Sequence, residues 1–159
     1  MRRLADRSLG PGERTLAQPR VVYRDGMWRD SSGDKPLPDD ERPALAYHTS
    51  SSANRDSIRL HGLDWERMGA APGLASGLNV PEEPAIFLAR DLGEARLFAG
   101  MPRDRDPEDI WAVRPEGLDI LEVVEGWVYC PTPIPADRLR LIETDLDPVE
   151  IRREQDDAG

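Results

Sequence analysis

Apolar positions in this chain gather in short runs that are separated by polar and turn-forming stretches. The run ALAYHTS, residues 44–50, is followed by three small residues and then by a mixed segment that ends at His61. Short apolar runs bounded by turn signals are typical of buried or half-buried strands. Strands are predicted over residues 44–50, 85–89, 109–113 and 117–124. Two further strands are predicted within residues 126–145.

A first helix is predicted over about residues 53–61. Ser51 or Ser52 offers the side-chain oxygen that caps the first turn of such a helix. Gly62 follows the last helical residue, where glycine commonly ends a helix, and Leu63 is the apolar residue that packs back after the stop.

A second helix is predicted directly after the run at 85–89. Asp91 and Glu94 have the spacing of a capping box, in which each side chain satisfies a backbone N–H group of the first turn. Apolar residues then recur at helical spacing and predict one buried face, formed by Leu92, Ala95, Phe98 and Ala99.

Residues 1–43 are interpreted as an amino-terminal arm. An Asp-Gly dipeptide between two short runs predicts a hairpin over 20–30. The segment 31–43 is polar and rich in proline, and we interpret it as a linker.

The compact domain is expected over residues 44–145, with a mobile loop at 64–84 and a charged, frayed tail at 146–159. The predicted elements follow one another in the order strand, helix, loop, strand, helix and then several strands. That order predicts an α+β domain with a split, largely antiparallel sheet and two short helices, and it argues against a doubly wound sheet.

Composition limits the classes of function. The chain has 159 residues, a net charge of −10 and a single lysine, Lys35, so duplex nucleic acid is a disfavoured partner. No apolar run approaches the roughly 20 residues that a membrane-spanning helix needs. One cysteine, Cys130, and an amino terminus without the apolar segment of a secretion signal favour the cytoplasm.

Nucleotide and metal motifs of the common kinds are missing. The chain has no glycine-rich dinucleotide fingerprint and no P-loop. Two histidines and one cysteine, spread from residue 48 to residue 130, do not have the spacing of a zinc site, so we expect no bound metal.

Three stretches together carry a family resemblance. The first stretch is Tyr47-His48-Thr49-Ser50, which leads into a helix that ends at His61-Gly62-Leu63. The second is Ile86-Phe87-Leu88-Ala89, which leads into a capped helix. The third is a late segment over 127–135, which continues into Arg138-Leu139-Arg140-Leu141. Their order over residues 44–143 resembles the ADP-ribosyltransferase superfamily in its minimal bacterial form. That group includes DarT-type DNA-modifying toxins, rifampicin ADP-ribosyltransferases and RNA 2′-phosphotransferases.

The resemblance implies a site for NAD, which is the substrate of these proteins. His48 matches the histidine that would hydrogen-bond a ribose hydroxyl and act in catalysis, and Thr49 and Ser50 match polar residues of the same pocket. Phe87 matches an aromatic position, often tyrosine, that would stack on nicotinamide. Phenylalanine keeps the ring there and loses the hydroxyl.

The remaining site residues are charged. Arg90 and Arg96 follow the second strand, and arginine side chains suit the oxygens of a pyrophosphate. An acidic residue that orients the acceptor or the ribose is expected late in the chain. Glu125 is the catalytic candidate, and Glu122 lies near the same strand.

Three functions remain open on these residues. The first is a toxin-like, NAD-dependent transfer of ADP-ribose to a protein, nucleic acid or small-molecule acceptor. The second is an RNA 2′-phosphotransferase-like activity, which also consumes NAD, and the third is a non-catalytic binding module on the same fold. In the plainer interpretation, His48 is a half-buried histidine that donates to a backbone carbonyl, and Phe87 is a core residue.

Overall fold

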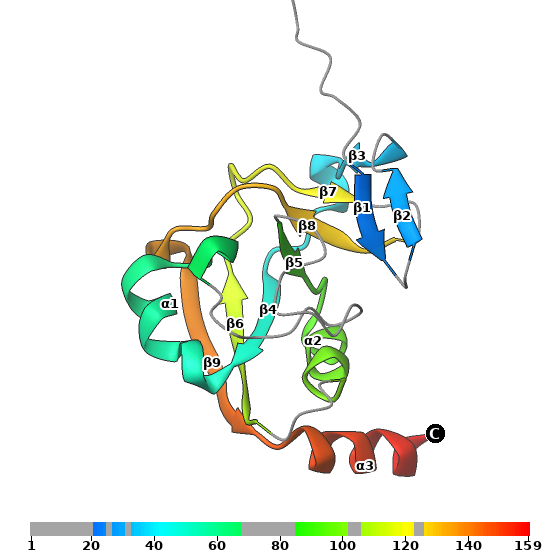
Figure 1. Ribbon diagram of the computed structural model, residues 1–159, viewed down its shortest axis with the longest axis vertical. Coiled ribbons are helices and arrows are strands. Elements are labelled where there is room, and N and C mark those ends of the chain that lie inside the picture. Colours follow the sequence, from blue (N-terminus) through cyan, green and yellow to red (C-terminus); the bar gives the residue numbers. More distant parts are fainter. Residues whose placement is uncertain (1–20, 25–26, 31–32, 68–84, 102–105, 123–125) are drawn as a thin grey trace, which may run out of the picture.

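Antiparallel sheets and α-helices make up the computed structural model of the chain (Figure 1), so the predicted α+β class is confirmed. The residues that the structure describes are 21–24, 27–30, 33–67, 85–101, 106–122 and 126–159.

A three-stranded antiparallel sheet forms one half of the fold. Its strands are β4 (Ala46–Ser51), β6 (Glu108–Val113) and β9 (Leu139–Leu146), in the order β4-β6-β9. All six residues of β6 are buried, because this central strand is covered on both faces.

A four-stranded antiparallel sheet forms the other half. Its order is β3-β7-β8-β5, built from β3 (Lys35–Pro36), β7 (Leu121–Glu122), β8 (Val128–Cys130) and β5 (Ile86–Leu88). The strands are short, because prolines and glycines interrupt the chain around them.

One pair of residues joins the two sheets. Tyr47 in β4 and Ala89, just after β5, exchange two backbone hydrogen bonds of 2.9 and 2.7 Å. Beyond this pair β4 continues along β6, while β5 continues along β8. The predicted split sheet is therefore present, and the split lies between β4 and β5.

The two helices of the prediction form where expected. Helix α1 (Arg55–His61) follows a 3-10 turn in which the Ser51 hydroxyl accepts from the backbone N–H of Ala53, at 3.3 Å. Helix α2 (Leu92–Ala99) begins at Asp91, whose carboxylate accepts from the N–H of Glu94 at 2.8 Å. The two helices lie on opposite sides of the three-stranded sheet (Figure 1).

A third helix corrects the prediction of a frayed carboxyl-terminal tail. Helix α3 (Pro148–Ala158) begins at Asp147, which caps the N–H of Val149 at 2.8 Å. The buried side chain of Ile151 packs this helix beside the end of α2, close to Gly100. An N-cap aspartate followed by proline is a recognised helix start, and the sequence analysis overlooked it because the segment is so highly charged.

The amino-terminal arm contains more structure than predicted. The hairpin is confirmed, with β1 (Val21–Arg24) paired antiparallel to β2 (Met27–Asp30). The segment interpreted as a linker belongs to the fold, because it supplies β3 and the buried side chain of Leu37, whose N–H bonds the carbonyl of Ile120 at 2.8 Å. A single apolar residue among polar ones gave no periodic signal for this.

Short 3-10 turns complete the described structure. They are η2 (Asp39–Glu41), η3 (Ser52–Asn54), η4 (Trp65–Arg67) and η5 (Ala136–Arg138). Most of the predicted loop at 64–84 lies outside the described residues. Within the described part of the chain, no helix has the length and apolar character needed to cross a bilayer.

Two of the three apolar clusters in the described residues hold the three-stranded sheet to its neighbours. The larger one fills the space between the two sheets and α1, and includes Ile58, Leu88, Trp111, Val113 and Val128. The smaller one lies under α2, on the other face of the three-stranded sheet, and includes Ala89, Ala95 and Ile110. Each face of that sheet is therefore packed against a different element.

Candidate functional site

His48 lies where the two sheets separate. If the ladder between β4 and β5 continued past Tyr47 and Ala89, Thr49 and Phe87 would be the next hydrogen-bonded pair. Instead, Nδ1 of His48 donates to the backbone carbonyl of Phe87, at 2.9 Å. The imidazole therefore bridges the strands at the point where their main chains diverge.

This contact fixes the state of the ring. A carbonyl oxygen can only accept, so the proton of the neutral imidazole is on Nδ1 and Nε2 keeps its lone pair. Burial lowers the pKa of His48 below its ordinary value of 6.5, and the hydrogen bond to Phe87 only partly opposes that shift. At neutral pH, His48 therefore presents an acceptor nitrogen at Nε2.

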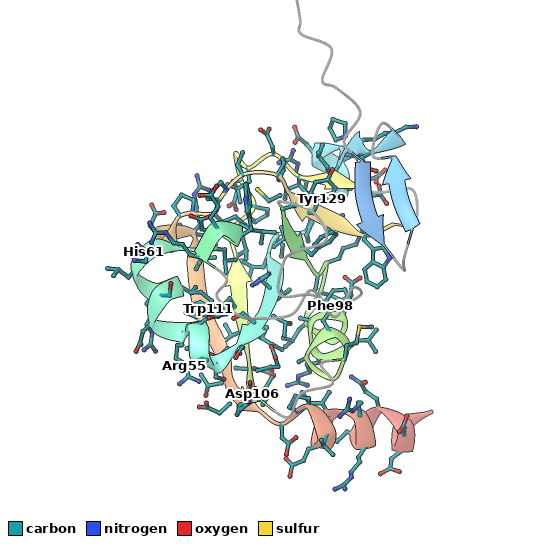
Figure 2. The ribbon with its side chains drawn as sticks, in the orientation of Figure 1. Arg55, His61, Phe98, Asp106, Trp111 and Tyr129 are labelled. Carbon is teal, nitrogen blue, oxygen red and sulfur yellow. The ribbon has the colours of Figure 1, made fainter. Side chains whose placement is uncertain are left out.

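Two other polar atoms lie on the same face of the sheet as the His48 side chain. His48 is directly opposite Trp111 in the β4–β6 ladder, and Ser50 is directly opposite Asp109. Trp111 is only 3% exposed (Figure 2). Among the described residues, neither its Nε1 nor the buried Oγ of Ser50 has a hydrogen-bond partner.

The position of these atoms calls for an explanation. A buried polar group without a partner costs about 1–3 kcal/mol, and native proteins contain few of them. Residues directly opposite in an antiparallel pair have Cβ atoms about 5 Å apart. His48, Ser50 and Trp111 therefore form one group of neighbouring side chains, here called the sheet-split group.

Thr49 points to the other face and is engaged there. Its hydroxyl donates to the backbone carbonyl of Ala95 in α2, at 2.9 Å. This bond ties the helix to the sheet. The structure thus separates Thr49 from His48 and Ser50, with which the sequence had grouped it.

Phe87 belongs to a group of four aromatic residues. Its ring centroid is 5.8 Å from that of Tyr129, and the ring centroids of Phe98 and Trp127 are 5.1 Å apart. Because side chains alternate along β5, the Phe87 ring points away from the core between the sheets, where Ile86 and Leu88 pack. His48 consequently meets the main chain of Phe87 and not its ring.

Both candidate arginines have carboxylate partners. Arg90 donates to Glu122 at 2.7 Å and to the carbonyl of Gly126 at 3.2 Å. Arg96 pairs with Glu143 of β9, with a closest contact of 2.6 Å. The first pair ties the turn after β5 to β7, and the second ties α2 to β9.

Glu125, the catalytic candidate, lies outside the described residues. Glu122, the other carboxylate near that strand, is described and is bound by Arg90. Within the described residues, no three His, Cys, Asp or Glu side chains come together in a way that could hold a metal ion.

A charged cluster next to the sheet-split group was not anticipated. Asp109 is completely buried, and both of its oxygens accept from Arg55, at 2.7 Å each. Ser52 and the backbone N–H of Asp145 also donate to it, at 2.7 and 3.1 Å. Arg55 additionally pairs with the Asp145 carboxylate, at 2.7 Å.

The hydrogen bonds decide the charge of Asp109. Burial alone raises the pKa of this carboxyl, but the donors Arg55, Ser52 and the Asp145 N–H outweigh it and hold the pKa below its ordinary value of 3.8. The aspartate is therefore ionised and joins three elements, β6, the start of α1, and β9. The apolar pattern of residues 109–113 did not predict a buried, ionised Asp109, because an aspartate at the first position of such a run is interpreted as the end of the strand.

Comparison with known proteins gives no family for this chain. No protein-family model matches it, and a search of curated proteins finds no significant match. A function is therefore inferred from the geometry of the site and from the order of the motifs along the chain.

Proposed function

We propose that this protein binds NAD as a substrate and transfers its ADP-ribose group to an acceptor, as members of the ADP-ribosyltransferase superfamily do. The observation that carries the proposal is the sheet-split group. His48 is held by the main chain of Phe87 with Nε2 unprotonated, beside the unpartnered polar atoms of Ser50 and Trp111. Polar atoms of this kind at a strand divergence suit a sugar with several hydroxyl groups.

The chemistry assigns a role to each atom. Cleavage of the N-glycosidic bond to nicotinamide leaves positive charge on the ribose, so the protein must hold the sugar still and place an anion nearby. In the proposal, Nε2 of His48 accepts from a ribose hydroxyl, and the Ser50 hydroxyl and the Trp111 N–H bond the remaining oxygens. Glu125 is assigned the anionic role.

Phe87 is assigned the stacking role for the nicotinamide ring. Its side chain is half-buried, and its contact with Tyr129 holds the ring in place. A ring that is already fixed loses little side-chain freedom when a ligand stacks on it. The role depends on the exposed part of the Phe87 ring.

Arg90 and Arg96 are assigned to the pyrophosphate. Each would have to share its guanidinium between a carboxylate and a phosphate, which five N–H donors allow. Arg90 is the better placed of the two, because it lies just after β5 and, within the described residues, only the Nη2 group of its guanidinium is engaged, by Glu122 and the carbonyl of Gly126.

Two observations bear on the alternatives. An RNA 2′-phosphotransferase-like activity would need a wide basic surface for its RNA substrate, and the net charge of −10 argues against one, so transfer of ADP-ribose is better supported. A non-catalytic binding module is favoured by the pairing of Glu122 with Arg90, which neutralises the described carboxylate nearest the third motif. That module is the second candidate.

The setting of the proposed activity is the cytoplasm. Cys130 is a free, buried thiol whose Sγ donates to the carbonyl of Thr132 at 3.2 Å, as expected of a protein kept in a reducing environment. The net charge of −10 makes duplex nucleic acid the least favoured acceptor class.

The test is release of nicotinamide from NAD by the purified protein. Protein, single-stranded nucleic acid and small-molecule acceptors are supplied in turn. The parent should release nicotinamide, and His48→Ala should lower the rate by roughly 100-fold, the cost of losing orientation in a site of this kind. His61→Ala removes the other, exposed histidine and should leave the rate unchanged.

Two results separate the alternatives. Formation of ADP-ribose 1″,2″-cyclic phosphate from a 2′-phosphorylated oligonucleotide would identify the phosphotransferase reaction. Absence of nicotinamide release with every acceptor class, from a parent protein shown to be folded, would exclude transfer and leave the non-catalytic module.

A further inference from the structure

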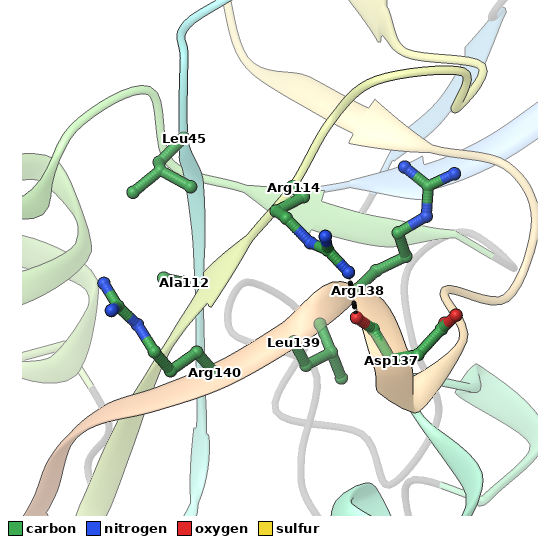
Figure 3. Close-up of a pocket in the computed structure, with 7 residues that line it drawn as sticks. All are labelled: Leu45, Ala112, Arg114, Asp137, Arg138, Leu139 and Arg140. Atoms are coloured by element: carbon green, nitrogen blue, oxygen red, sulfur yellow. Dashed lines mark hydrogen bonds between the residues drawn. The ribbon is translucent and has the colours of Figure 1, made fainter.

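A hollow of about 470 Å³ lies on the three-stranded sheet, on the face that points away from the His48 side chain (Figure 3). Ala112 of β6 and Arg140 of β9 are directly opposite in the ladder and share this face with Tyr47. Arg114 lies two residues beyond Ala112 on the same face. The hollow is lined by Leu45, Ala112, Arg114, Asp137, Arg138, Leu139 and Arg140.

Arg114 and Arg140 are exposed and Arg138 is half-buried, and within the described residues none of the three has a carboxylate oxygen closer than 3.9 Å. Arg114 donates to the backbone carbonyl of Asp137, so that contact orients the guanidinium and leaves its charge unmatched. Arg138 donates to the carbonyl of Glu116, and the Glu116 carboxylate is 3.9 Å away and largely exposed. Arg140 makes no side-chain hydrogen bond or ion pair within the described residues.

Three arginines elsewhere in the protein are closely matched by carboxylates. Arg55, Arg90 and Arg96 each have a carboxylate oxygen at 2.6–2.7 Å. Three arginines and one acidic residue, Asp137, line the hollow, and the Glu116 carboxylate lies 3.9 Å from Arg138. In a protein whose net charge is −10, this is a local excess of positive charge.

We infer that this hollow binds a small organic anion through Arg140, Arg114 and Arg138. The chemical class is a phosphate or carboxylate attached to an apolar or planar group, because guanidinium groups fit the oxygens of either anion. Leu45 and Ala112 supply the apolar surface on this face, whereas the Leu139 side chain packs with the core on the other face. Ligand pockets commonly have volumes of about 300–1,000 Å³, so the hollow suits a molecule of this size.

The site is held by the sheet, which prepares it for binding. Ala112 and Arg140 are fixed by the β6–β9 ladder, and the N–H of Arg114 bonds the carbonyl of Arg138 at 3.0 Å. A ligand would therefore order three side-chain ends and no main chain, which keeps the entropic cost of binding low. The inference does not depend on NAD binding at His48.

The test uses phenyl phosphate, benzoate and inorganic phosphate as probes, with binding followed by NMR shifts of the backbone amides and the arginine Nε–H groups. We expect saturable shifts at Ala112, Arg114 and Arg140 with phenyl phosphate or benzoate. The tighter of the two identifies the anion. Inorganic phosphate should bind more weakly, because it lacks the ring that would contact Leu45 and Ala112.

Variants make the result decisive. Arg140→Ala removes a guanidinium with no described partner, so the fold should be kept while binding weakens by about tenfold. Arg59→Ala changes an exposed arginine on α1 and should leave binding unchanged. Absence of saturable shifts at millimolar probe, or equal weakening by both variants, would overturn the inference.

Discussion

At the scale of single residues, His48 combines the two interpretations that its sequence context left open. One ring nitrogen donates to a backbone carbonyl, as a structural histidine does, and this contact prepares the other nitrogen as an acceptor. The same residue can therefore join the two strands and serve a ligand. Sequence spacing placed His48 at the end of an apolar run and could not reveal which nitrogen was used.

The protonation of His48 is directly testable. Burial lowers its pKa below 6.5, so the unfolded chain binds a proton more readily than the folded protein. The contribution of His48 to stability is accordingly complete above about pH 6.5 and is lost as the pH falls through the folded pKa. NMR of the imidazole nitrogens should show the proton on Nδ1 and a titration midpoint below 6.5.

The contrary result for His48 is also clear. A proton on Nε2 would contradict the hydrogen bond to Phe87, and a midpoint at or above 6.5 would contradict the burial that lowers the pKa of His48.

Gly62 shows why one backbone position admits only glycine. Its φ of 77° and ψ of −164° belong to a region that is essentially restricted to glycine, and an added Cβ would lie 2.1 Å from the carbonyl oxygen of Ile134. Gly62→Ala should lower the free energy of unfolding by more than about 2 kcal/mol, since backbone strain and a clash add.

Gly117→Ala is the matched control for Gly62→Ala. Gly117 also has a positive φ, 73°, but a Cβ there would approach no atom closer than 3.9 Å. Gly117→Ala should lower the free energy of unfolding only by the backbone strain, about 1–2 kcal/mol. Equal losses for the two variants, measured by urea unfolding, would refute the clash at Ile134.

At the scale of elements, the buried carboxylate of Asp109 holds together segments that are far apart in the sequence. Asp109→Asn keeps the size of the side chain and removes the charge that Arg55 matches. The variant should lose about 3 kcal/mol of unfolding free energy, as is typical when a buried ion pair is broken. Asp56→Asn breaks the exposed pair with Arg59 and should leave the unfolding midpoint nearly unchanged.

The contribution of Asp109 to stability falls as the pH falls, like that of His48, although the folded protein favours the charged form of Asp109 and the neutral form of His48. Because the folded pKa lies below 3.8, the stabilisation is present above about pH 3.8 and is lost as the pH falls through the folded value. The parent should therefore lose stability between pH 4 and pH 2 more steeply than Asp109→Asn. Parallel acid unfolding curves would count against an ionised, buried Asp109.

The elements that were predicted correctly have a sequence pattern that is contained within a few consecutive residues. The cap at Asp91, the stop at Gly62 and the apolar strands at 85–89 and 109–113 were all found in the sequence and are confirmed. The missed elements lack such signals: β3 has two residues, and charged side chains make up more than half of the eleven-residue helix α3.

The candidate site was less predictable than the fold, because it depends on contacts between distant segments. No pattern within residues 44–50 shows that Thr49 bonds α2, while His48 and Ser50 face Trp111 across the ladder. The arginine partners Glu122 and Glu143 lie 32 and 47 residues from Arg90 and Arg96, respectively. Alternation along β4 predicts which side chains share a face and leaves their partners undetermined.

At the scale of the whole molecule, the three-stranded sheet presents different chemistry on its two faces. One face carries the sheet-split group and the Asp109 cluster, and packs against α1 and the second sheet. The other face packs against α2 at one end and carries the arginine-lined hollow at the other. NAD has a pyrophosphate, so the two faces must be distinguished in any binding experiment.

The most direct test of the central claim is NAD binding measured by calorimetry on four proteins: the parent, His48→Ala, His61→Ala and Arg140→Ala. The parent should bind NAD, and His48→Ala should weaken binding by more than about tenfold, or about 1.4 kcal/mol. His61→Ala and Arg140→Ala should bind like the parent. Loss of affinity in Arg140→Ala alone, equal affinity in the parent and His48→Ala, or no binding by a folded parent would contradict a nucleotide site at His48.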